Sequence, residues 1–392
     1  MGVLSLISEP VRLGAVGLGR AFALTAPAIT AHPGVRLVAA AAPRLESRAA
    51  FEAAFGGRSY DDVRALAADG DVEALYISTP HGMHLEHALV AFAQGKHVLI
   101  EKPMTVALEE ATQMIGAGRE AGVQLIVGPS HSFDAPVAVA ADLIGQGAIG
   151  EVRMIHALYA TDFLYRPRRP EELVTDLGGG VVFSQAVHQI DVIRRLAGRP
   201  ARQVTARTGG AWDPARQTEG AWSMLIDFDG GVFASLTYSG YDHFDGDRLM
   251  ENISELGAPK PDDPGAARRD LSRVANEPAA KRARGFTTLD DCPQGVTHEH
   301  FGQIIVFGER QDLRLTPYGV EISSDHARGF RSAPFRTTRA EVFDAVHAAV
   351  RKAQPPLQDG VWGRASLEIC HALLQSARSD TTVPLSLQKG QP

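Results

Sequence analysis

His97-Val98-Leu99-Ile100-Glu101-Lys102-Pro103 is a short apolar run that ends abruptly at an acid, a base and a proline. The run predicts a buried strand of an open α/β sheet, with Lys102 at its carboxyl end. Such sheets bind their ligands at this edge, and a lysine there is desolvated enough to act as more than a surface charge. An isolated Glu-Lys-Pro is more often a strand end followed by a solvated lysine, so the rest of the chain decides between the two interpretations.

The beginning of the chain has the pattern of a dinucleotide-binding turn. Residues 11–16 form an apolar, β-rich run that leads into Gly17-Leu18-Gly19-Arg20, and a helical pattern follows over residues 22–31. Glycines let the backbone approach a pyrophosphate, and the helix N-terminus then supplies N–H donors to it. The third glycine of G-x-G-x-x-G would fall at position 22, where this chain has Phe22. This departure predicts that the helix packs more loosely on the strand, or that it faces the strand with a different phase.

The second predicted strand, residues 36–41, bears on the choice of cofactor. It is followed by Ala42-Pro43-Arg44, where NAD-binding units usually have an acid that binds the ribose hydroxyls. The missing carboxylate and the guanidinium of Arg44 favour a 2′-phosphate, and hence NADP. The alternative, that Arg44 is only a solvated loop residue, stays open.

Strands and helices continue to alternate over the first third of the chain. Residues 72–78 and 123–127 predict further strands, and Tyr60-Asp61-Asp62 predicts the start of a helix that runs to residue 68. This regularity implies an α/β fold with a parallel sheet that has helices on both faces. One crevice at the carboxyl ends of these strands would be lined by Gly17, Arg44, Thr79 and Lys102.

Three motifs in a fixed order make the sequence similar to a known family. They are Gly17-x-Gly19, Ser78-Thr79-Pro80 with His84 four residues later, and Gly95-Lys96-His97-Val98 running into Glu101-Lys102-Pro103. With this spacing the chain resembles the glucose–fructose oxidoreductase/inositol dehydrogenase (Gfo/Idh/MocA) family. The resemblance implies a nicotinamide cofactor, NAD or NADP, with Lys102 beside the nicotinamide and the reacting hydroxyl. The cofactor-binding residues that it implies are Gly17, Gly19, Arg20, Arg44, Thr79, Pro80, His84, Glu101 and Lys102.

The resemblance also implies two domains. A Rossmann domain is expected over residues 1–130, and an α+β substrate and oligomerisation domain with a mainly antiparallel, open sheet over residues 131–380. Residues 362–377 predict a helix that packs back on the first domain. Residues 246–297 are rich in Asp, Pro, Arg and Ala and predict an insertion, which would be a mobile loop, a lid or an oligomer arm. The open face of the sheet has to be covered, so we expect a homodimer or a homotetramer.

A helix after Gly178-Gly179-Gly180 carries the second candidate for chemistry. Ser184, His188 and Asp191 lie on one face of this predicted helix by their spacing. The family has a glycine-rich turn followed by His-x-x-Asp, so the resemblance implies that His188 is the general acid/base, a role that the pKa of histidine suits. The family often has an acid at position 184, where this chain has Ser184. The alternatives are that His188 and Asp191 only pack within the helix.

The loop Tyr165-Arg166-Pro167-Arg168-Arg169-Pro170 predicts an anion-binding group, because each arginine offers a bidentate fork to a carboxylate. The alternative is a solvated basic loop that pairs with the glutamates that follow it. This loop, the turn before His188 and Gly240-Tyr241-Asp242-His243-Phe244-Asp245 together resemble the branch of the family formed by phthalate 4,5-cis-dihydrodiol dehydrogenases. The substrate-binding residues that we expect are Arg166, Arg168, Arg169, Ser184, Asp191 and Tyr241.

The predicted function is therefore NAD(P)-dependent oxidation of a secondary alcohol of a cyclic polyol by hydride transfer. The substrate that fits the arginines is a carboxylated aromatic cis-dihydrodiol of the phthalate type, because oxidation of one hydroxyl gives a ketone that tautomerises to an aromatic catechol. Alternatives are a sugar or inositol dehydrogenase and a glycosidase with bound NAD. A cofactor-binding sensor without turnover belongs to another class, and the presence of both Lys102 and His188 argues against it.

Composition excludes several other classes of protein. The 392 residues include 39 Lys and Arg and 46 Asp and Glu, which gives a formal charge of −7 and no basic stripe for nucleic acid. No apolar run is long enough to span a bilayer, and the N-terminus has no signal-peptide pattern. Cys292 and Cys370 make no disulfide framework. We expect a cytoplasmic enzyme that acts on a small, anionic molecule and has no metal site, nucleic-acid partner or membrane partner.

Overall fold

The protein is described by a computed structural model that covers residues 9–210, 212–241 and 243–388. Its contacts divide the chain into two compact units. The first unit comprises the described residues up to Pro129, together with Arg282–Gln294 and Arg339–Arg364. The second comprises Ser130–Lys281, Gly295–Thr338 and the described residues from Ala365 on. The division by sequence assigned residues 282–294 and 339–364 to the second domain, whereas their contacts group them with the first.

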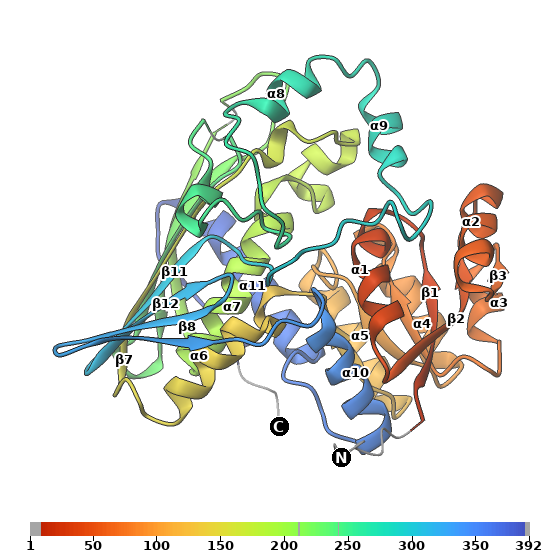
Figure 1. The fold of residues 1–392 in the computed structure, drawn as a ribbon, viewed down its shortest axis with the longest axis horizontal. Helices are drawn as coiled ribbons and strands as arrows, with labels where there is room; N and C mark the ends of the chain where they lie inside the picture. Colours follow the sequence, from red (N-terminus) through yellow and green to blue (C-terminus); the bar gives the residue numbers. More distant parts are fainter. Residues whose placement is uncertain (1–8, 211, 242, 389–392) are drawn as a thin grey trace. The chain divides into compact units, whose positions relative to one another are not determined.

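The first unit contains a six-stranded sheet in the order β3-β2-β1-β4-β5-β6, and every pairing in it is parallel (Figure 1). Its strands are β1 (Val11–Val16), β2 (Val35–Ala41), β3 (Arg58–Tyr60), β4 (Ala74–Ile77), β5 (His97–Ile100) and β6 (Leu125–Val127). The helices of this unit are α1 (Arg20–Ala31), α2 (Leu45–Phe55), α3 (Val63–Ala67), α4 (His84–Ala93), α5 (Leu108–Glu120) and α10 (Ala340–Lys352). The central strands are almost continuously buried, as expected of a covered parallel sheet. The predicted Rossmann fold is confirmed.

The edge strand β3 was not predicted. Tyr60 was expected to begin a helix, but residues 58–60 pair with residues 39–41 of β2, and the helix α3 begins only at Val63. Three residues are too few to show a hydrophobic period, and this strand is defined by main-chain pairing with its neighbour. The helix start is set by Asp62, whose side chain accepts a hydrogen bond from the N–H of Arg64.

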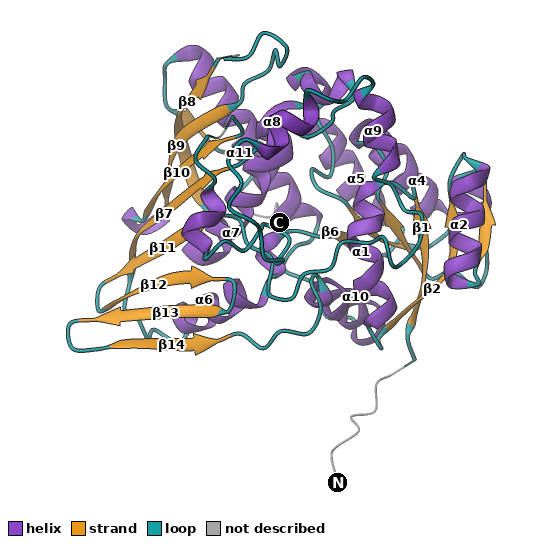
Figure 2. Cartoon of the chain, turned by 45° about the horizontal axis from the view of Figure 1, so that its top comes forward, coloured by secondary structure: helices purple, strands orange, loops and turns teal. Residues whose placement is uncertain are grey.

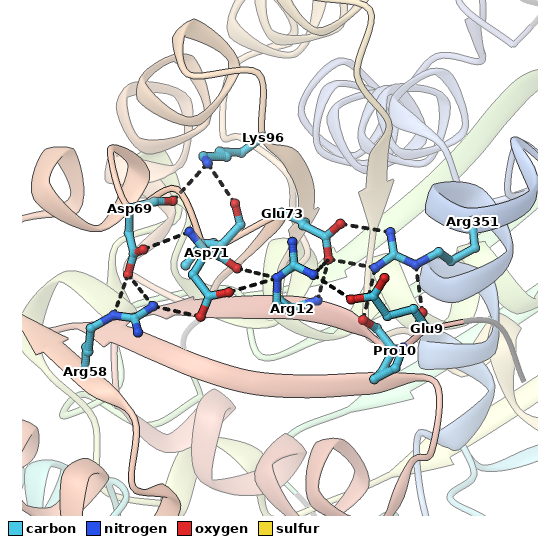
Figure 3. Close-up of polar contacts among 10 residues, drawn as sticks. Glu9, Pro10, Arg12, Arg58, Asp69, Asp71, Glu73, Lys96 and Arg351 are labelled. Carbon is cyan, nitrogen blue, oxygen red and sulfur yellow. Dashed lines mark hydrogen bonds and ion pairs between the residues drawn. The ribbon is translucent and has the colours of Figure 1, made fainter.

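A charged network occupies the amino-terminal ends of the parallel strands. Glu73, just before β4, accepts hydrogen bonds from the main-chain N–H of Arg12 (3.0 Å) and from two nitrogens of Arg351 in α10 (2.9 and 2.7 Å). Figure 3 shows this network, which also includes Glu9, Pro10, Arg58, Asp69, Asp71 and Lys96. The bidentate pair fastens α10 to the sheet at the edge opposite the carboxyl ends of the strands.

The second unit contains a nine-stranded sheet in the order β14-β13-β12-β11-β7-β10-β9-β8-β15 (Figure 2). Only β7 and β10 pair in parallel, and the other pairs are antiparallel, as predicted. The strands are β7 (Val152–Ala160), β8 (Ala201–Gly209), β9 (Ala221–Phe228), β10 (Phe233–Ser239), β11 (Gln303–Gly308), β12 (Gln311–Thr316), β13 (Gly319–Ser324), β14 (Arg328–Ser332) and β15 (Val383–Pro384). Buried and accessible residues alternate along β7, β9 and β10, so one face of the sheet carries the core.

The remaining helices are α6 (Ala135–Gly145), α7 (Val187–Ala197), α8 (Ala266–Leu271), α9 (Glu277–Ala283) and α11 (Gly360–Ser379). Helices α6 and α7 contact each other and the core face of the second sheet. The weakly periodic region 246–297 contains the 3-10 helix Gly246–Met250, the two short helices α8 and α9, and irregular segments. Within the described part of the chain, no helix combines the length and the apolar character that crossing a membrane requires.

Candidate active site

The glycine turn lies where the chain order of the first sheet reverses, because β1 is the neighbour of both β2 and β4. Gly17 has a φ of 89°, and a Cβ there would lie 3.0 Å from the side chain of Thr79 and 3.2 Å from the carbonyl oxygen of Ser78. Gly19 is the N-cap of α1, no side chain caps it, and a Cβ on it would meet nothing within 4 Å. The helix N-terminus therefore has open space beside it, which fits a dinucleotide pyrophosphate.

The strand β5 ends in a lysine between buried neighbours. Glu101 is only 8% exposed and accepts a 2.6 Å hydrogen bond from the hydroxyl of Tyr76 in β4. Burial and the nearby carboxylate raise the pKa of Tyr76 well above its ordinary value, so this hydroxyl stays a donor. The chain is thus anchored at the residue before Lys102, and Lys102 itself is partly exposed. This combination positions an ammonium group at the carboxyl edge of the sheet.

His84 connects the loops that follow β4 and β5. It is fully buried, with Nε2 2.9 Å from the carbonyl oxygen of Thr79 and Nδ1 3.2 Å from the carbonyl oxygens of Pro103 and Met104. Burial lowers the pKa of His84 to about 4, so the ring is neutral near pH 7. A neutral ring has one N–H, so His84 donates to a carbonyl oxygen of one loop and packs against the other. The exposed Pro80 lies in the loop that follows β4.

The end of β2 carries two arginines. Arg44 is exposed and is the N-cap residue of α2, where it makes no side-chain capping bond. Arg48, one turn further, donates hydrogen bonds to the carbonyl oxygens of Ala42 (2.9 Å) and Pro43 (3.1 Å). Sequence reasoning missed Arg48, although its spacing of four residues from Arg44 on a helix was a usable signal.

In the second unit, His188 lies at the start of a helix that is buried on nearly every side. A π-helical turn, Val182–Ala186, leads into α7. Between residues 181 and 194 every residue is buried except Ser184 and His188. These two side chains are therefore the only accessible ones on this part of the helix. Local π-helical turns occur frequently at functional sites, where they change which residues share a face.

The ring of His188 is packed against His131 and Phe301, with centroids 4.7 and 5.1 Å away. His131 Nδ1 lies 2.8 Å from a carboxylate oxygen of Asp134, and both residues are buried. Potential ligand atoms of His131, Asp134 and Glu299 all lie within 4.8 Å of one another, and we call these three residues the His131 cluster. Sequence reasoning missed the cluster, because Glu299 is remote in the chain; the signal for His131 was its place just after the last predicted strand of the Rossmann sheet.

Asp191, the third residue predicted on this helix face, is 4% exposed and accepts a hydrogen bond from the hydroxyl of Ser130. Ser130 immediately precedes His131. The contact therefore joins α7 to the segment that carries His131, and it also limits the rotation of the helix that carries His188.

Arg166 already has carboxylate partners within the second unit. It contacts Glu255 at 2.7 and 3.3 Å and Asp162 at 2.7 Å. Desolvation alone would raise the pKa of the partly buried Glu255, but the Arg166 guanidinium, and more weakly His131 and His300, lower it to about 2. Arg166 could bind a substrate carboxylate only by giving up or sharing this ion pair.

The other predicted substrate-binding residues of the loops differ in how many contacts constrain their side chains. Arg168 stacks on the ring of Phe163 at 3.6 Å and donates to its carbonyl oxygen at 2.8 Å. Arg169 is partly exposed, and its ion-pair distances to Glu171 and Glu172 are 3.3 and 3.6 Å. Tyr241 is buried, with its ring stacked on Trp212 and its hydroxyl accepting a 3.2 Å hydrogen bond from the main-chain N–H of that residue. Arg169 is therefore the least constrained of these groups.

Comparisons with known proteins agree with this geometry. The profile of the Gfo/Idh/MocA oxidoreductase family, NAD-binding Rossmann fold, matches residues 11–129, and the Gfo/Idh/MocA C-terminal domain matches residues 137–251. The chain is 42% identical over 382 residues to 1-carboxy-3-chloro-3,4-dihydroxycyclohexa-1,5-diene dehydrogenase of Comamonas testosteroni, covering 94% of this chain and 96% of the relative.

Two more distant similarities are also informative. Trans-1,2-dihydrobenzene-1,2-diol dehydrogenase of Mus musculus is 27% identical over 231 residues, which are 57% of this chain and 68% of the mouse protein. A solved structure of a protein from Bordetella bronchiseptica RB50 superposes with a TM-score of 0.93 at 36% identity and covers 96% of this chain and 100% of that one. The chain belongs to the Gfo/Idh/MocA oxidoreductase family and is an NAD-binding dehydrogenase that acts on CH–OH groups.

Proposed function

We propose that the protein oxidises one hydroxyl of a carboxylated cis-dihydrodiol to give, after tautomerisation, a catechol. The observation that carries the proposal is the 42% identity, over nearly the whole of both chains, to a dehydrogenase named for a carboxylated dihydroxycyclohexadiene. The driving force is chemical, because removal of two hydrogens from a cyclohexadiene diol restores an aromatic ring.

Two side chains of this protein are assigned to the reacting alcohol. The Lys102 ammonium donates a hydrogen bond to the hydroxyl oxygen and stabilises the negative charge that develops there. His188 accepts the hydroxyl proton as general base. A bound nicotinamide supplies the acceptor for the hydride that leaves the same carbon with its electron pair. The alcohol becomes a ketone. The proton on the neighbouring ring carbon, which bears the second hydroxyl, then moves to the ketone oxygen, and this tautomerisation gives the catechol.

The His131 cluster is assigned a supporting role. His131 contacts the ring of His188 and is hydrogen-bonded to Asp134, so a positive charge on His188 would form close to buried carboxylates. Carboxylates near an imidazole favour its protonated form. We propose that this cluster replaces the acid that other members of the family often have at the position of Ser184.

The substrate carboxylate is assigned to the arginine loop, and first to Arg169. Its partners Glu171 and Glu172 are at 3.3 and 3.6 Å and are themselves partly accessible, so exchanging them for a ligand costs little. Removal of Arg169 should raise KM for a carboxylated diol by about 10- to 100-fold, the factor expected for a charge-assisted hydrogen bond. It should leave KM for an uncharged dihydrodiol unchanged.

For the cofactor we propose a preference for NADP, supported by the absence of an acid after β2 and by the arginines there. Arg44 is exposed and would meet a 2′-phosphate, and Arg48 would add a second positive charge. The Kd for NADPH should be lower than that for NADH, and Arg44→Ser should remove most of the difference. Equal affinities in the unchanged protein would contradict this assignment.

A panel of substrates read by nicotinamide absorbance tests the function. Carboxylated cis-dihydrodiols, uncharged dihydrodiols, sugars and inositols are compared with both cofactors. Turnover of a sugar or inositol, without turnover of a carboxylated diol, would replace the proposed substrate class. Lys102→Met should abolish turnover and leave cofactor binding measurable. Lys96→Met is the matched control, because Lys96 lies just before the same strand, at its other end, and donates to main-chain oxygens.

We also propose a homo-oligomer built on the accessible face of the second sheet. Leu225 in β9 is 47% exposed and Phe233 in β10 is 39% exposed, and both strands lie in the middle of the sheet. Light scattering on the purified protein measures the mass of the assembly. A monomer at micromolar concentration would exclude this part of the proposal.

A further inference from the structure

The glycine turn has a neighbour that comes from far along the chain. Residues 282–294, which we call the strap, follow α9 and cluster with the first unit; Figure 1 shows the chain after α9 running beside α1. The main-chain N–H of Phe286 donates to the carbonyl oxygen of Leu18 at 3.2 Å. A Cβ on Gly285 would lie 3.4 Å from the same oxygen and 3.8 Å from the Cα of Gly19. The strap therefore contacts the two residues that follow Gly17.

Aromatic rings fasten the strap to the first unit. Phe286 is 4% exposed, and its ring meets that of Phe22 edge to face, with centroids 5.2 Å apart and an angle of 79° between the planes. It also lies 5.4 Å from the ring of Phe55 in α2. Phe22 is the fully buried residue that stands in the place of the third glycine of the dinucleotide motif. The strap thus supplies the packing partner that this unusual residue needs.

Hydrogen bonds within the strap limit its freedom. The hydroxyls of Thr287 and Thr288 donate to the carboxylate of Asp291 at 2.8 and 2.7 Å. Cys292 is buried, and its thiol donates to the carbonyl oxygen of Thr288 at 3.3 Å. Burial raises the pKa of this thiol, whereas the positive charge of Arg20, the first residue of α1, lowers it. The strap therefore also lies near the N-terminus of α1.

We propose that the strap is a wall of the dinucleotide site and that Phe286 is a positioning residue for the cofactor. A pyrophosphate at the N-terminus of α1 meets the main chain of Leu18 and Gly19. The sheet holds this turn from one side, and the strap holds it through Leu18 and Phe22. The strap stabilises the binding conformation, and cofactor release requires it to loosen. The inference rests on dinucleotide binding alone and is independent of the substrate assignment.

The test is the affinity for NADH, measured by fluorescence, together with the dissociation rate measured by stopped flow. Phe286→Ala should raise Kd about tenfold, the factor that corresponds to two lost aromatic contacts, mainly through faster dissociation. The KM for the cofactor should rise together with its Kd. Phe51→Ala is the matched control, because Phe51 is fully buried in α2 and stacks on Phe55 at 5.1 Å. An unchanged Kd in Phe286→Ala, or an equal rise in Phe51→Ala, would overturn the proposal.

A second variant keeps the test decisive if Phe286→Ala does not fold. Gly285→Val leaves every aromatic ring in place but puts a branched side chain 3.2 Å from the carbonyl oxygen of Arg282 and 3.4 Å from that of Leu18. It should raise Kd for NADH in the same way. In the unchanged protein, NADH should slow tryptic cleavage after Arg282 and Arg284, and this protection should be lost in Gly285→Val. If NADH does not change the rate of tryptic cleavage in the unchanged protein, the strap is not a wall of the dinucleotide site.

Discussion

Replacement of Arg166 by methionine tests whether this arginine stabilises the second unit or binds the substrate. Methionine retains much of the length of the side chain and removes its charge and hydrogen bonds. In the structure the guanidinium contacts Glu255 and Asp162, so the change leaves the partly buried carboxyl of Glu255 without its main partner. We expect the second unit to lose stability and not merely substrate affinity.

The magnitude follows from the structure in two ways. A pKa of about 2 for Glu255, against an ordinary value of 4.5, corresponds to about 3 kcal/mol of interaction that favours the charged form. Arg166 and Glu255 keep 25% and 20% of their side-chain surfaces accessible, so the loss should lie at the lower end of the about 3–5 kcal/mol typical of a fully buried ion pair. Asp162 moderates the loss, because Lys260 also lowers its pKa. A decrease of about 3 kcal/mol in the free energy of unfolding is therefore expected.

Urea unfolding followed by tryptophan fluorescence measures this change. Trp212 and Trp222 lie in the second unit and Trp362 in the first, so the signal reports mainly on the unit that contains Arg166. Arg169→Met is the control, and its partly exposed ion pairs predict a loss below about 1 kcal/mol. The double variant Arg166→Met/Glu255→Leu should recover part of the loss, because it also removes the unpaired, partly buried charge of Glu255.

One result would refute the reasoning. Arg166→Met could unfold at the same urea concentration as the unchanged protein while KM for a carboxylated diol rises. In that case the guanidinium binds the substrate, and its ion pair with Glu255 does not contribute to the free energy of unfolding. The loop would then bind its ligand through the arginine that the structure commits most strongly to other partners.

Three further predictions concern other parts of the molecule. Tyr76→Phe removes the hydroxyl that donates a 2.6 Å hydrogen bond to the buried Glu101, and it should lower the free energy of unfolding by about 2 kcal/mol. If the loss also moves Lys102, kcat should fall. Urea unfolding and turnover are measured on the same preparation. The lowered pKa of Glu255 contributes about 3 kcal/mol of stability that is present above pH 4.5 and is lost as the pH falls towards 2. This pH dependence should be absent in Glu255→Gln. Acid titration followed by circular dichroism measures it in both proteins. Dialysis against EDTA should leave turnover unchanged, because the His131 cluster is assigned to proton chemistry; activity lost in EDTA and restored by zinc would make the cluster a metal site.

The sequence predicted the first sheet more completely than the second. In the Rossmann unit, β1, β5 and α1 were recognised from a continuous apolar run or a helical period beside glycine and proline, because these signals are local. The strands β13 and β14 were missed, since every residue of β14 is exposed and no hydrophobic alternation marks it. The edge strand β3 was missed because it is short and is defined by its partner.

The residues of the candidate site also fall into those that local sequence motifs could identify and those that they could not. Gly17, Lys102 and His188 could be selected from motifs, because each is fixed by the turn, strand end or helix on which it lies. His131, Asp134 and Glu299 could not be selected together, since Glu299 lies 168 positions after His131. Tertiary packing brings the two segments together, with the ring of Phe301 in contact with the rings of His131 and His188. Nor could the sequence show that Arg166 already has acidic partners, one of them 89 residues away.

By itself, the amino-acid order determined the family, the two kinds of sheet and the residues with the right chemistry, because local periodicity and short-range spacing encode them. Only the tertiary structure decided which charged groups are committed to one another and which remain available. It also decided that residues 282–294 contact the glycine turn through the main chain of Phe286 and pack on α1 through Phe22. Burial and electrostatic partners arise between segments that are distant in the chain, and these contacts set the pKa of Glu255 and the surroundings of His188.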